Sequence, residues 1–251
     1  MKVCVLGSGS NGNSVYVKSG NTSVLFDAGF SARELKRRLS AIDVDPCELS
    51  AIVISHEHGD HVAGLRVMGR NFTVYGTAGT LETLCRRFKM NGTEAVRAGD
   101  TCRIGDMSVL PVPTSHDATD SVGFVVEDGD HRIAIMTDLG VVTRSVRDRL
   151  CDLSLAVIEA NHDPAMLLDG PHPWHVKQRV KSRLGHLSNA ESAGLASDIS
   201  CPGLQAMLLA HLSAENNTPE LAVAAVQKTM DGSGVRIEAC RQDRPTCVFS
   251  L

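Results

Sequence analysis

The sequence predicts an α/β fold, an αββα sandwich in which two mixed β-sheets face each other and helices cover their outer faces. Strand-like and helix-like segments alternate along the whole chain of 251 residues. The strand-like segments fall into two groups, each followed by helices, and such an order favours two sheets. No linker-like stretch separates the groups. We therefore expect a single domain over residues 1–251.

The first group of strands begins at the N-terminus. Short apolar segments separated by glycine, serine and asparagine predict strands at residues 3–6, 14–18 and 23–27. Ser31 and Glu34 have the spacing of a capping box, which predicts a helix through about residue 39. The apolar run 51–55 is typical of a strand buried on both faces. A strand at 72–75 and a helix at 80–89 complete this group.

The second group has longer strands and more helices. Ser188 and Glu191 have capping-box spacing, and Thr218 is an N-cap candidate before a proline. The predicted strands are 107–112, 123–127, 132–136, 155–158, 206–209 and 235–239. The predicted helices are 143–149, 165–168, 174–183, a helix from Ser188 to about 197, and one from Thr218 to about 230.

The composition limits the class of protein. Apolar residues make up 43% and charged residues 22%, which is ordinary for a soluble globular chain. The formal net charge of -4 argues against a generally basic surface, so a nucleic-acid substrate would need local basic patches. None of the eight cysteines is in a C-x-x-C pair, and we interpret them as reduced thiols. No signal peptide or membrane span is evident, and the expected location is the cytoplasm without membrane association.

A histidine-rich motif directly follows the buried run 51–55. It reads His56-Glu57-His58-Gly59-Asp60-His61. Alternate side chains of an extended segment point the same way, so His56 and His58 can meet one ion. Gly59 permits a tight turn, after which Asp60 and His61 can face a second ion. Imidazoles with a carboxylate suit zinc, manganese or iron(II).

This motif resembles the signature of the metallo-β-lactamase superfamily, and the later ligands of that family also have matching positions near predicted strand ends. The resemblance implies two divalent metal ions, zinc or manganese, with iron as an alternative. It implies a first site of His56, His58 and His116, a second site of Asp60, His61 and His211, and Asp138 as the bridging ligand.

Two ions roughly 3.5–4 Å apart would supply hydrolytic chemistry. A water that bridges them loses a proton near neutral pH, and the resulting hydroxide is the expected nucleophile. The same ions neutralise charge that develops on the substrate. Departure of the leaving group still needs a proton donor.

His186 is the candidate proton donor. It lies in Gly185-His186-Leu187-Ser188, and the tripeptide His-Leu-Ser occurs again at His211. This arrangement resembles the tRNA 3′-processing (RNase Z) branch, in which a histidine before a helix assists phosphodiester cleavage with support from a Glu-Ala motif. Glu159-Ala160 fits that motif, so the resemblance implies Asp60, His186 and Glu159 as catalytic residues. The alternative is that His186 only packs beside the capping box.

A closer resemblance is to the YycJ (WalJ) family. It rests on motifs spread along the chain: residues 7–13, 159–163, Pro173-Trp174, 185–189 and 211–217. It implies a metal-dependent nuclease with 5′ to 3′ exonuclease action on double-stranded DNA. Glu215 stands where the family commonly has aspartate. The chain is too short for the additional β-CASP domain of larger nucleases, and no long inserted arm is evident.

A basic segment leads directly to His186. Its residues Lys177, Arg179, Lys181 and Arg183 follow Trp174 and are candidates for guiding a phosphate backbone toward the metals. His162 is a candidate for the mouth of the site. The alternative for these basic side chains is an ordinary solvated helix face.

The leading hypothesis is hydrolysis of nucleic acid, DNA in the first place. A small cyclic or nucleotide phosphodiesterase is the first alternative, and the acidic net charge favours it. A thioester or lactone hydrolase is the second. A metal-binding redox or regulatory protein is the alternative from another class. The oligomeric state is left open, with a homodimer as one option.

Overall fold

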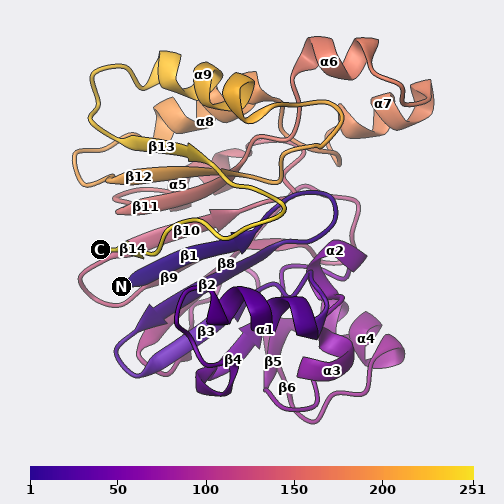
Figure 1. Ribbon diagram of the computed structural model, residues 1–251, viewed down its shortest axis with the longest axis vertical. Helices are drawn as coiled ribbons and strands as arrows, with labels where there is room; N and C mark the ends of the chain where they lie inside the picture. The colour runs from indigo at the N-terminus through magenta and orange to yellow at the C-terminus, as the bar shows by residue number, and fades with distance from the viewer.

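Two seven-stranded β-sheets face each other in the computed structural model, which describes residues 1–251 (Figure 1). Both sheets are mixed. In the first, β14, β1, β2 and β3 pair antiparallel, and β3 to β6 pair parallel. In the second, β7 to β10 pair antiparallel and β10 to β13 pair parallel. The predicted αββα architecture is confirmed.

The first sheet has the order β14-β1-β2-β3-β4-β5-β6 and contains both ends of the chain. Its strands are β1 (Lys2–Gly7), β2 (Ser14–Ser19), β3 (Thr22–Phe26), β4 (Ala51–Val53), β5 (Val74–Thr77), β6 (Thr93–Val96) and β14 (Phe249–Ser250). The second sheet has the order β13-β12-β11-β10-β9-β8-β7. Its strands are β7 (Cys102–Ile104), β8 (Met107–Pro113), β9 (Val122–Glu127), β10 (Arg132–Met136), β11 (Leu155–Glu159), β12 (Ala206–Ala210) and β13 (Arg236–Ala239).

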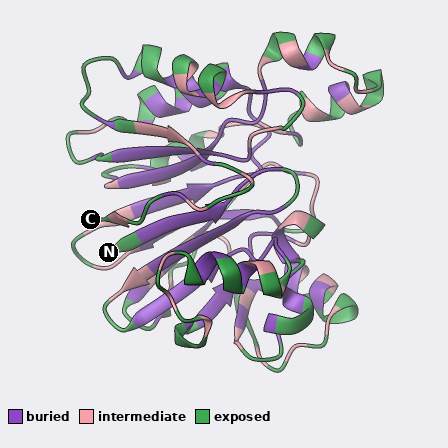
Figure 2. Ribbon diagram, in the orientation of Figure 1, coloured by how far each residue is buried: buried purple, intermediate pink, exposed green.

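Helices cover the outer faces of the two sheets, and their solvent-facing sides are exposed (Figure 2). On the first sheet these are α1 (Ala32–Ser40), the short 3₁₀ helix η1 (Pro46–Glu48), α2 (Gly59–Val62), α3 (Leu65–Met68) and α4 (Ala78–Arg87). The second half contributes α5 (Arg144–Arg149), α6 (Pro164–Asp169), α7 (Trp174–Val180), α8 (Asn189–Ile199) and α9 (Pro219–Thr229). Helices α6 and α7 project from the body at the upper right of Figure 1. No helix is both long and apolar enough to cross a bilayer.

The core has three layers of apolar side chains. A cluster of 22 buried residues lies between the sheets, where the rings of Phe26 and Phe124 approach to 5.2 Å. A second cluster packs α1, α3 and α4 against the first sheet, and a third packs α5, α8 and α9 against the second. Because aromatics are scarce, aliphatic side chains fill most of this volume. Burial of these side chains is the main source of stability.

The two predicted capping boxes differ in the structure. Ser188 and Glu191 form the full reciprocal box at the start of α8. Ser31 caps α1 through Glu34 N, but the carboxylate of Glu34 instead binds Arg37 and Arg38. The expected helix at 174–183 is wrong at its end: α7 stops at Val180, because the chain turns and His186 N donates to Val180 O. Strands β6, β7 and β14 were missed, since none of them contains a continuous apolar run like that of β4.

One edge of the sandwich gathers the carboxyl ends of several strands. Strands β3 and β4 are parallel, as are β10, β11 and β12, so their ends meet at this edge. The chain turns sharply there: Asp27, Asp138 and His211 follow β3, β10 and β12 with positive φ of 58°, 56° and 54°. Non-glycine residues rarely adopt this conformation, and it is common at functional sites.

Candidate metal centre

The seven predicted metal ligands come together at this strand-end edge. His56 follows β4, and α2 provides Asp60 and His61 within one helical turn. His116, Asp138 and His211 follow β8, β10 and β12. The structure therefore brings into one site side chains from both sheets that are far apart in the sequence.

The glycine that matters for this arrangement is Gly29 rather than Gly59. The chain does turn into α2 at Gly59, but a Cβ there would meet open space and its φ is not positive, so this turn does not require glycine. A Cβ at Gly29 would lie 1.7 Å from Asp60 O and 2.4 Å from Asn13 N. Only glycine lets the backbone of Asp60 approach this closely.

One group of donors comprises His56, His58 and His116, whose candidate ligand atoms lie within 4.8 Å of one another. His116 Nε2 is 3.2 Å from His58 Nδ1. His56 Nε2 is buried and has no hydrogen-bond partner. Three converging imidazole nitrogens of this kind suit a divalent cation of the zinc class.

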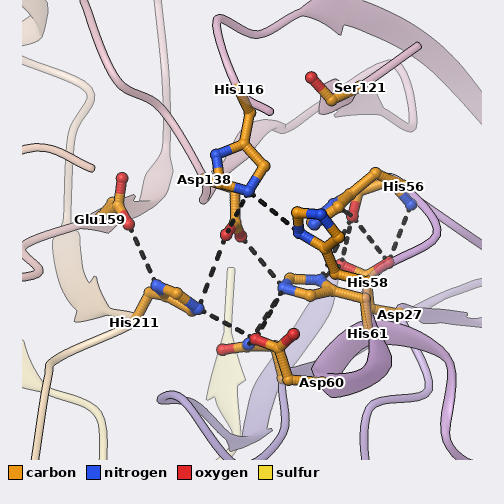
Figure 3. A network of polar contacts seen from close by, with 12 residues as sticks. Asp27, His56, His58, Asp60, His61, His116, Ser121, Asp138, Glu159 and His211 are labelled. Atoms are coloured by element: carbon orange, nitrogen blue, oxygen red, sulfur yellow. Dashed lines mark hydrogen bonds and ion pairs between the residues drawn. The ribbon is translucent and has the colours of Figure 1, made fainter. Parts of the chain in front are cut away.

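A second group comprises Asp60, His61 and His211, also within 4.8 Å. Asp60 Oδ2 lies 3.4 Å from His61 Nε2 and 3.3 Å from His211 Nε2. Asp138 stands between the two groups: its carboxylate lies 3.1 Å from His61 Nε2, 3.6 Å from His211 Nε2 and 3.5 Å from His116 Nε2 (Figure 3). A carboxylate in this place can bind an ion on each side.

These donors fit two divalent cations on the chemistry of the site itself. Buried polar atoms are normally hydrogen-bonded, and those that are not call for an explanation. His56 Nε2 is buried without such a bond, and Asp138 Oδ2 has only its ion-pair contact with His61 Nε2 at 3.1 Å. A bound cation would satisfy each of these atoms.

In the metal-free cluster, buried carboxylates and histidines shift one another's pKa values in opposite directions. Burial opposes a charged imidazole, yet the carboxylate of Asp138 raises the pKa of both His61 and His211 well above the usual value, with help from Asp27 and Asp60 respectively. Burial lowers the pKa of His56, and the neighbouring charged His61 lowers it further. Burial alone would raise the pKa of Asp138, but His211 and His61 hold it well below its usual range.

We expect metal binding to release protons from His61 and His211, since metal ligation requires neutral imidazole. The raised pKa of both groups favours their protonated form in the metal-free chain, so metal affinity should keep rising with pH above 6.5, the ordinary pKa of histidine. The measurement is calorimetric zinc titration in buffers of different ionisation enthalpy. A binding enthalpy that does not depend on the buffer would contradict this protonation pattern.

Asp27 and Ser55 support the cluster from beneath, and sequence reasoning missed both. Asp27 Oδ2 is 2.7 Å from His61 Nδ1, and its other oxygen accepts from Ser55 N at 2.8 Å. Ser55 Oγ also lies 2.9 Å from His56 Nδ1. These contacts fix which ring nitrogen of His61 and His56 faces the metal group. The sequence signal that could have found Asp27 was its place at the end of the predicted strand 23–27. The structure then brings it close to Ser55 by pairing Phe26 with Val53.

Asp27→Asn is expected to weaken metal binding by about 10- to 100-fold, as loss of a carboxylate behind a ligating histidine usually does. The amide keeps the shape but not the charge that favours an Nδ1 proton on His61. Metal affinity is measured by competition with a chromogenic chelator. Asp43→Asn is the matched control, because Asp43 shares the positive φ but lies after α1, outside the cluster. Equal affinities in the two variants would contradict the supporting role of Asp27.

Glu57, the acidic residue inside the histidine motif, turns away from the cluster. Its Oε1 accepts hydrogen bonds from Thr119 N at 2.9 Å and Thr119 Oγ1 at 2.7 Å. Thr119 lies in the loop between β8 and β9 that contains His116. Glu57 therefore ties this loop to the histidine motif and is not among the grouped metal donors.

The structure also brings His186 and Glu159 into contact. His186 Nδ1 lies 2.7 Å from Glu159 Oε1, and Glu159 is fully buried. The other oxygen of Glu159 accepts from Leu139 N at 2.9 Å and Leu187 N at 3.2 Å. Burial would raise the pKa of Glu159, but His186 and His211 lower it to about 2. The carboxylate is thus ionised, and its contact with His211 Nδ1 at 3.1 Å was not expected from the sequence.

A polar cavity of about 240 Å³ opens over the cluster. It is lined by Ser10, His58, Asp60, His116, Asp138, Asn161, His172, Arg179, Val180, His186, His211, Ser213 and Asn216. Ser10 belongs to the glycine-rich loop before β2. In the same loop, Asn13 Nδ2 lies 3.2 Å from Asp60 Oδ2. The loop therefore forms part of the site.

Of the five predicted substrate-binding residues, one lines the cavity and four do not. Arg179 lines the cavity. Lys181 and Arg183 are exposed on the loop after α7 and outside the cavity lining. Lys177 is buried, and its Nζ donates to Leu168 O at 2.6 Å, so it is not free to guide a phosphate. His162 is 3% exposed and absent from the lining, so its placement at the mouth is wrong: its backbone bridges to Ser188 and its ring packs inside.

Comparisons with known proteins agree with this fold. A family model described as "Beta-lactamase superfamily domain" matches residues 22–212. The chain is 32% identical to exodeoxyribonuclease YycJ of Bacillus anthracis over 92% of this chain and 89% of that protein. It is 32% identical to exodeoxyribonuclease WalJ of Streptococcus pneumoniae serotype 2, over 88% and 85%. The metallo-β-lactamase-fold protein YhfI of Bacillus subtilis superposes with a TM-score of 0.75 at 18% identity, covering 98% of each chain.

Proposed function

The chain belongs to the YycJ and WalJ family of the β-lactamase superfamily, and from this premise we propose that it is a two-metal phosphodiesterase that degrades DNA from an end. The proposed polarity is 5′ to 3′ on double-stranded DNA. The observation that carries the proposal is the His186–Glu159 pair: His186 lines the cavity, and both residues lie within 4.8 Å of the candidate ligands Asp138 and His211. Both relatives are named exodeoxyribonucleases, which supports DNA as the substrate.

The proposed ligands are His56, His58 and His116 for one ion, and Asp60, His61 and His211 for the other, with Asp138 shared. Zinc or manganese fits these nitrogen and carboxylate donors, and iron is the alternative. When bound, two such ions supply an activated water and positive charge for a phosphate oxygen.

His186 is proposed to hand a proton to the leaving oxygen. Because Glu159 is ionised, it accepts a hydrogen bond from Nδ1–H of His186. This contact leaves Nε2 of His186 for the substrate side of the ring, which lines the cavity. A protonated His186 can then donate from Nε2 to the departing oxygen, and the buried carboxylate stabilises the imidazolium. Two further carboxylates face the histidine ligands: Asp60 Oδ2 lies beside His211 Nε2, and Asp138 Oδ2 lies beside His61 Nε2.

The acidic net charge of -4 favours one alternative substrate class, and the cavity is compatible with it. A volume of about 240 Å³ suits a single nucleotide, so a small nucleotide or cyclic phosphodiester is the second candidate substrate. An exonuclease also needs to admit only the terminal nucleotide, so the cavity alone does not separate the two candidates. A thioester or lactone hydrolase has less support, because the relatives that match most of the chain at 32% identity are named exodeoxyribonucleases.

The deciding experiment compares substrates. Metal-reconstituted protein is incubated with 5′- and 3′-labelled single- and double-stranded DNA, with RNA, and with bis(p-nitrophenyl) phosphate. The proposal expects early release of labelled mononucleotide from the 5′ end of duplex DNA. Turnover of the generic ester without cleavage of any polynucleotide would overturn the nuclease proposal in favour of the small phosphodiesterase.

We further propose that residues 1–251 act as one domain in the cytoplasm. The pairing of β14 with β1 and the shared site between the two sheets support one domain. The eight cysteines are all unpaired, which suits a reducing compartment. Four of them, Cys47, Cys85, Cys151 and Cys247, are exposed.

A further inference from the structure

Asp117 directly follows the proposed ligand His116 in the sequence. Its Oδ1 is buried without a hydrogen-bond partner. This oxygen lies 3.3 Å from His116 Nε2 and 4.0 Å from His58 Nε2. One side of the carboxylate therefore faces the first group of metal donors, although Asp117 is not a member of any grouped donor set.

The other oxygen of Asp117 reaches α7. Asp117 Oδ2 forms an ion pair with Arg179 Nη1 at 3.1 Å. The side chain of Arg179 is 63% exposed, and that of Asp117 is 28% exposed. Arg179 is the one arginine or lysine in the cavity lining, and Asp117 is its partner in the ion pair. Without this partner, a long and largely exposed side chain would sample many rotamers.

We propose that Asp117 is a positioning residue: it holds the guanidinium of Arg179 at the mouth of the metal cavity, where Arg179 binds a non-bridging phosphate oxygen of the substrate. This inference rests on the proposed phosphodiesterase function and adds the element that recognises the phosphate. A neutral lactone, by contrast, offers Arg179 no anionic oxygen.

The chemistry of arginine suits this task. A guanidinium has five N–H donors in a planar fork, and the ion pair with Asp117 engages one terminal nitrogen. The remaining donors are free to bind a phosphate oxygen, and pre-organisation lowers the entropy lost when they do so. Asp117 thus acts through Arg179 and is not proposed to touch the substrate.

The sign of the effect separates positioning from simple electrostatics. Removing a carboxylate beside an anion site should tighten phosphate binding if charge alone matters. If Asp117 positions Arg179, Asp117→Ala should instead weaken phosphate binding. The weakening should also disappear when Arg179 is already absent, because the two residues then form a coupled pair.

The test measures binding of thymidine 5′-monophosphate to metal-loaded protein by calorimetry, with metal content measured by elemental analysis. Arg179→Ala should weaken binding about 10- to 100-fold, as for a hydrogen bond to a charged group. Asp117→Ala should weaken it about 3- to 5-fold, the scale of an exposed ion pair. In the Arg179→Ala background, Asp117→Ala should cause no further loss. Metal content should equal that of the wild type in all three variants.

A matched control is the ion pair between Arg147 and Asp198, 2.8 Å long and 53% and 45% exposed, which joins α5 to α8 outside the cavity. Arg147→Ala and Asp198→Ala should leave nucleotide binding unchanged. Unchanged or tighter binding in Asp117→Ala would overturn the inference, and so would loss of metal, which would make Asp117 a ligand. A wild type that binds nucleotide through this pair yet cleaves no polynucleotide would contradict only the nuclease proposal.

Discussion

His58→Ala is expected to lower phosphodiester hydrolysis by at least about 10³-fold, because it removes one of three imidazoles from the first group of donors and with it transition-state charge stabilisation. The side chain of His58 is 34% exposed, so its loss costs little packing. The measurement is the rate on labelled duplex DNA and on bis(p-nitrophenyl) phosphate, together with metal content.

His131→Ala is the control for this prediction. His131 has a similar exposure of 26% and also lies near a carboxylate, Asp128, but it is outside the cavity. It should retain wild-type rate and metal content. A His58→Ala protein that loses less than about tenfold in rate would show that the first group of donors is not needed for the reaction.

His186→Ala is expected to slow cleavage by about 10²- to 10⁴-fold, the usual contribution of a positioned general acid. Its metal content should remain close to that of the wild type, because His186 supports the leaving group in this account and not the ions. The effect should be smaller on bis(p-nitrophenyl) phosphate than on DNA, since a nitrophenolate leaves without needing a proton.

His175→Ala provides the comparison on the neighbouring helix, because His175 is exposed on α7 and does not line the cavity. If His186→Ala loses metal, His186 is a ligand and its proposed role is wrong. Glu159→Gln is less clean as a probe, since Glu159 contacts both His186 and His211 and binds two backbone amides.

Most of the fold could be predicted because its signals are local. The apolar run before the histidine motif gave a buried strand, and β4 begins at Ala51 as expected. Thr218 and Pro219 marked the start of α9 correctly. Strand β7 was missed, because Arg103 interrupts its apolar residues and it lacks the continuous apolar run that marked β4.

The site could be predicted where ligands cluster in the sequence or follow a strand. Asp27 and Asp117 could not be assigned, because each is a single acidic residue whose partner lies in another element. Asp27 meets Ser55 only through the parallel register of β3 and β4. Asp117 meets Arg179 only once α7 packs beside the loop after β8.

Burial of polar side chains was also invisible in the sequence. Lys177 and His162 looked like surface residues near the site, but the structure places both inside. Lys177 is held by a carbonyl of α6, which anchors α7 to its neighbour. Of the basic residues before His186, only Arg179 therefore lines the cavity. Lys181 and Arg183 are exposed on the loop after α7.

The central claim is that the site holds two divalent ions at once, and stoichiometry tests it most directly. Metal-free protein is titrated with zinc and with manganese, and bound metal is measured by elemental analysis while phosphodiester hydrolysis is followed in parallel. We expect two ions per chain, with activity that appears only as the second site fills, and one ion in the His211→Ala variant. Saturation of the wild type at one ion, with full activity, would contradict the account.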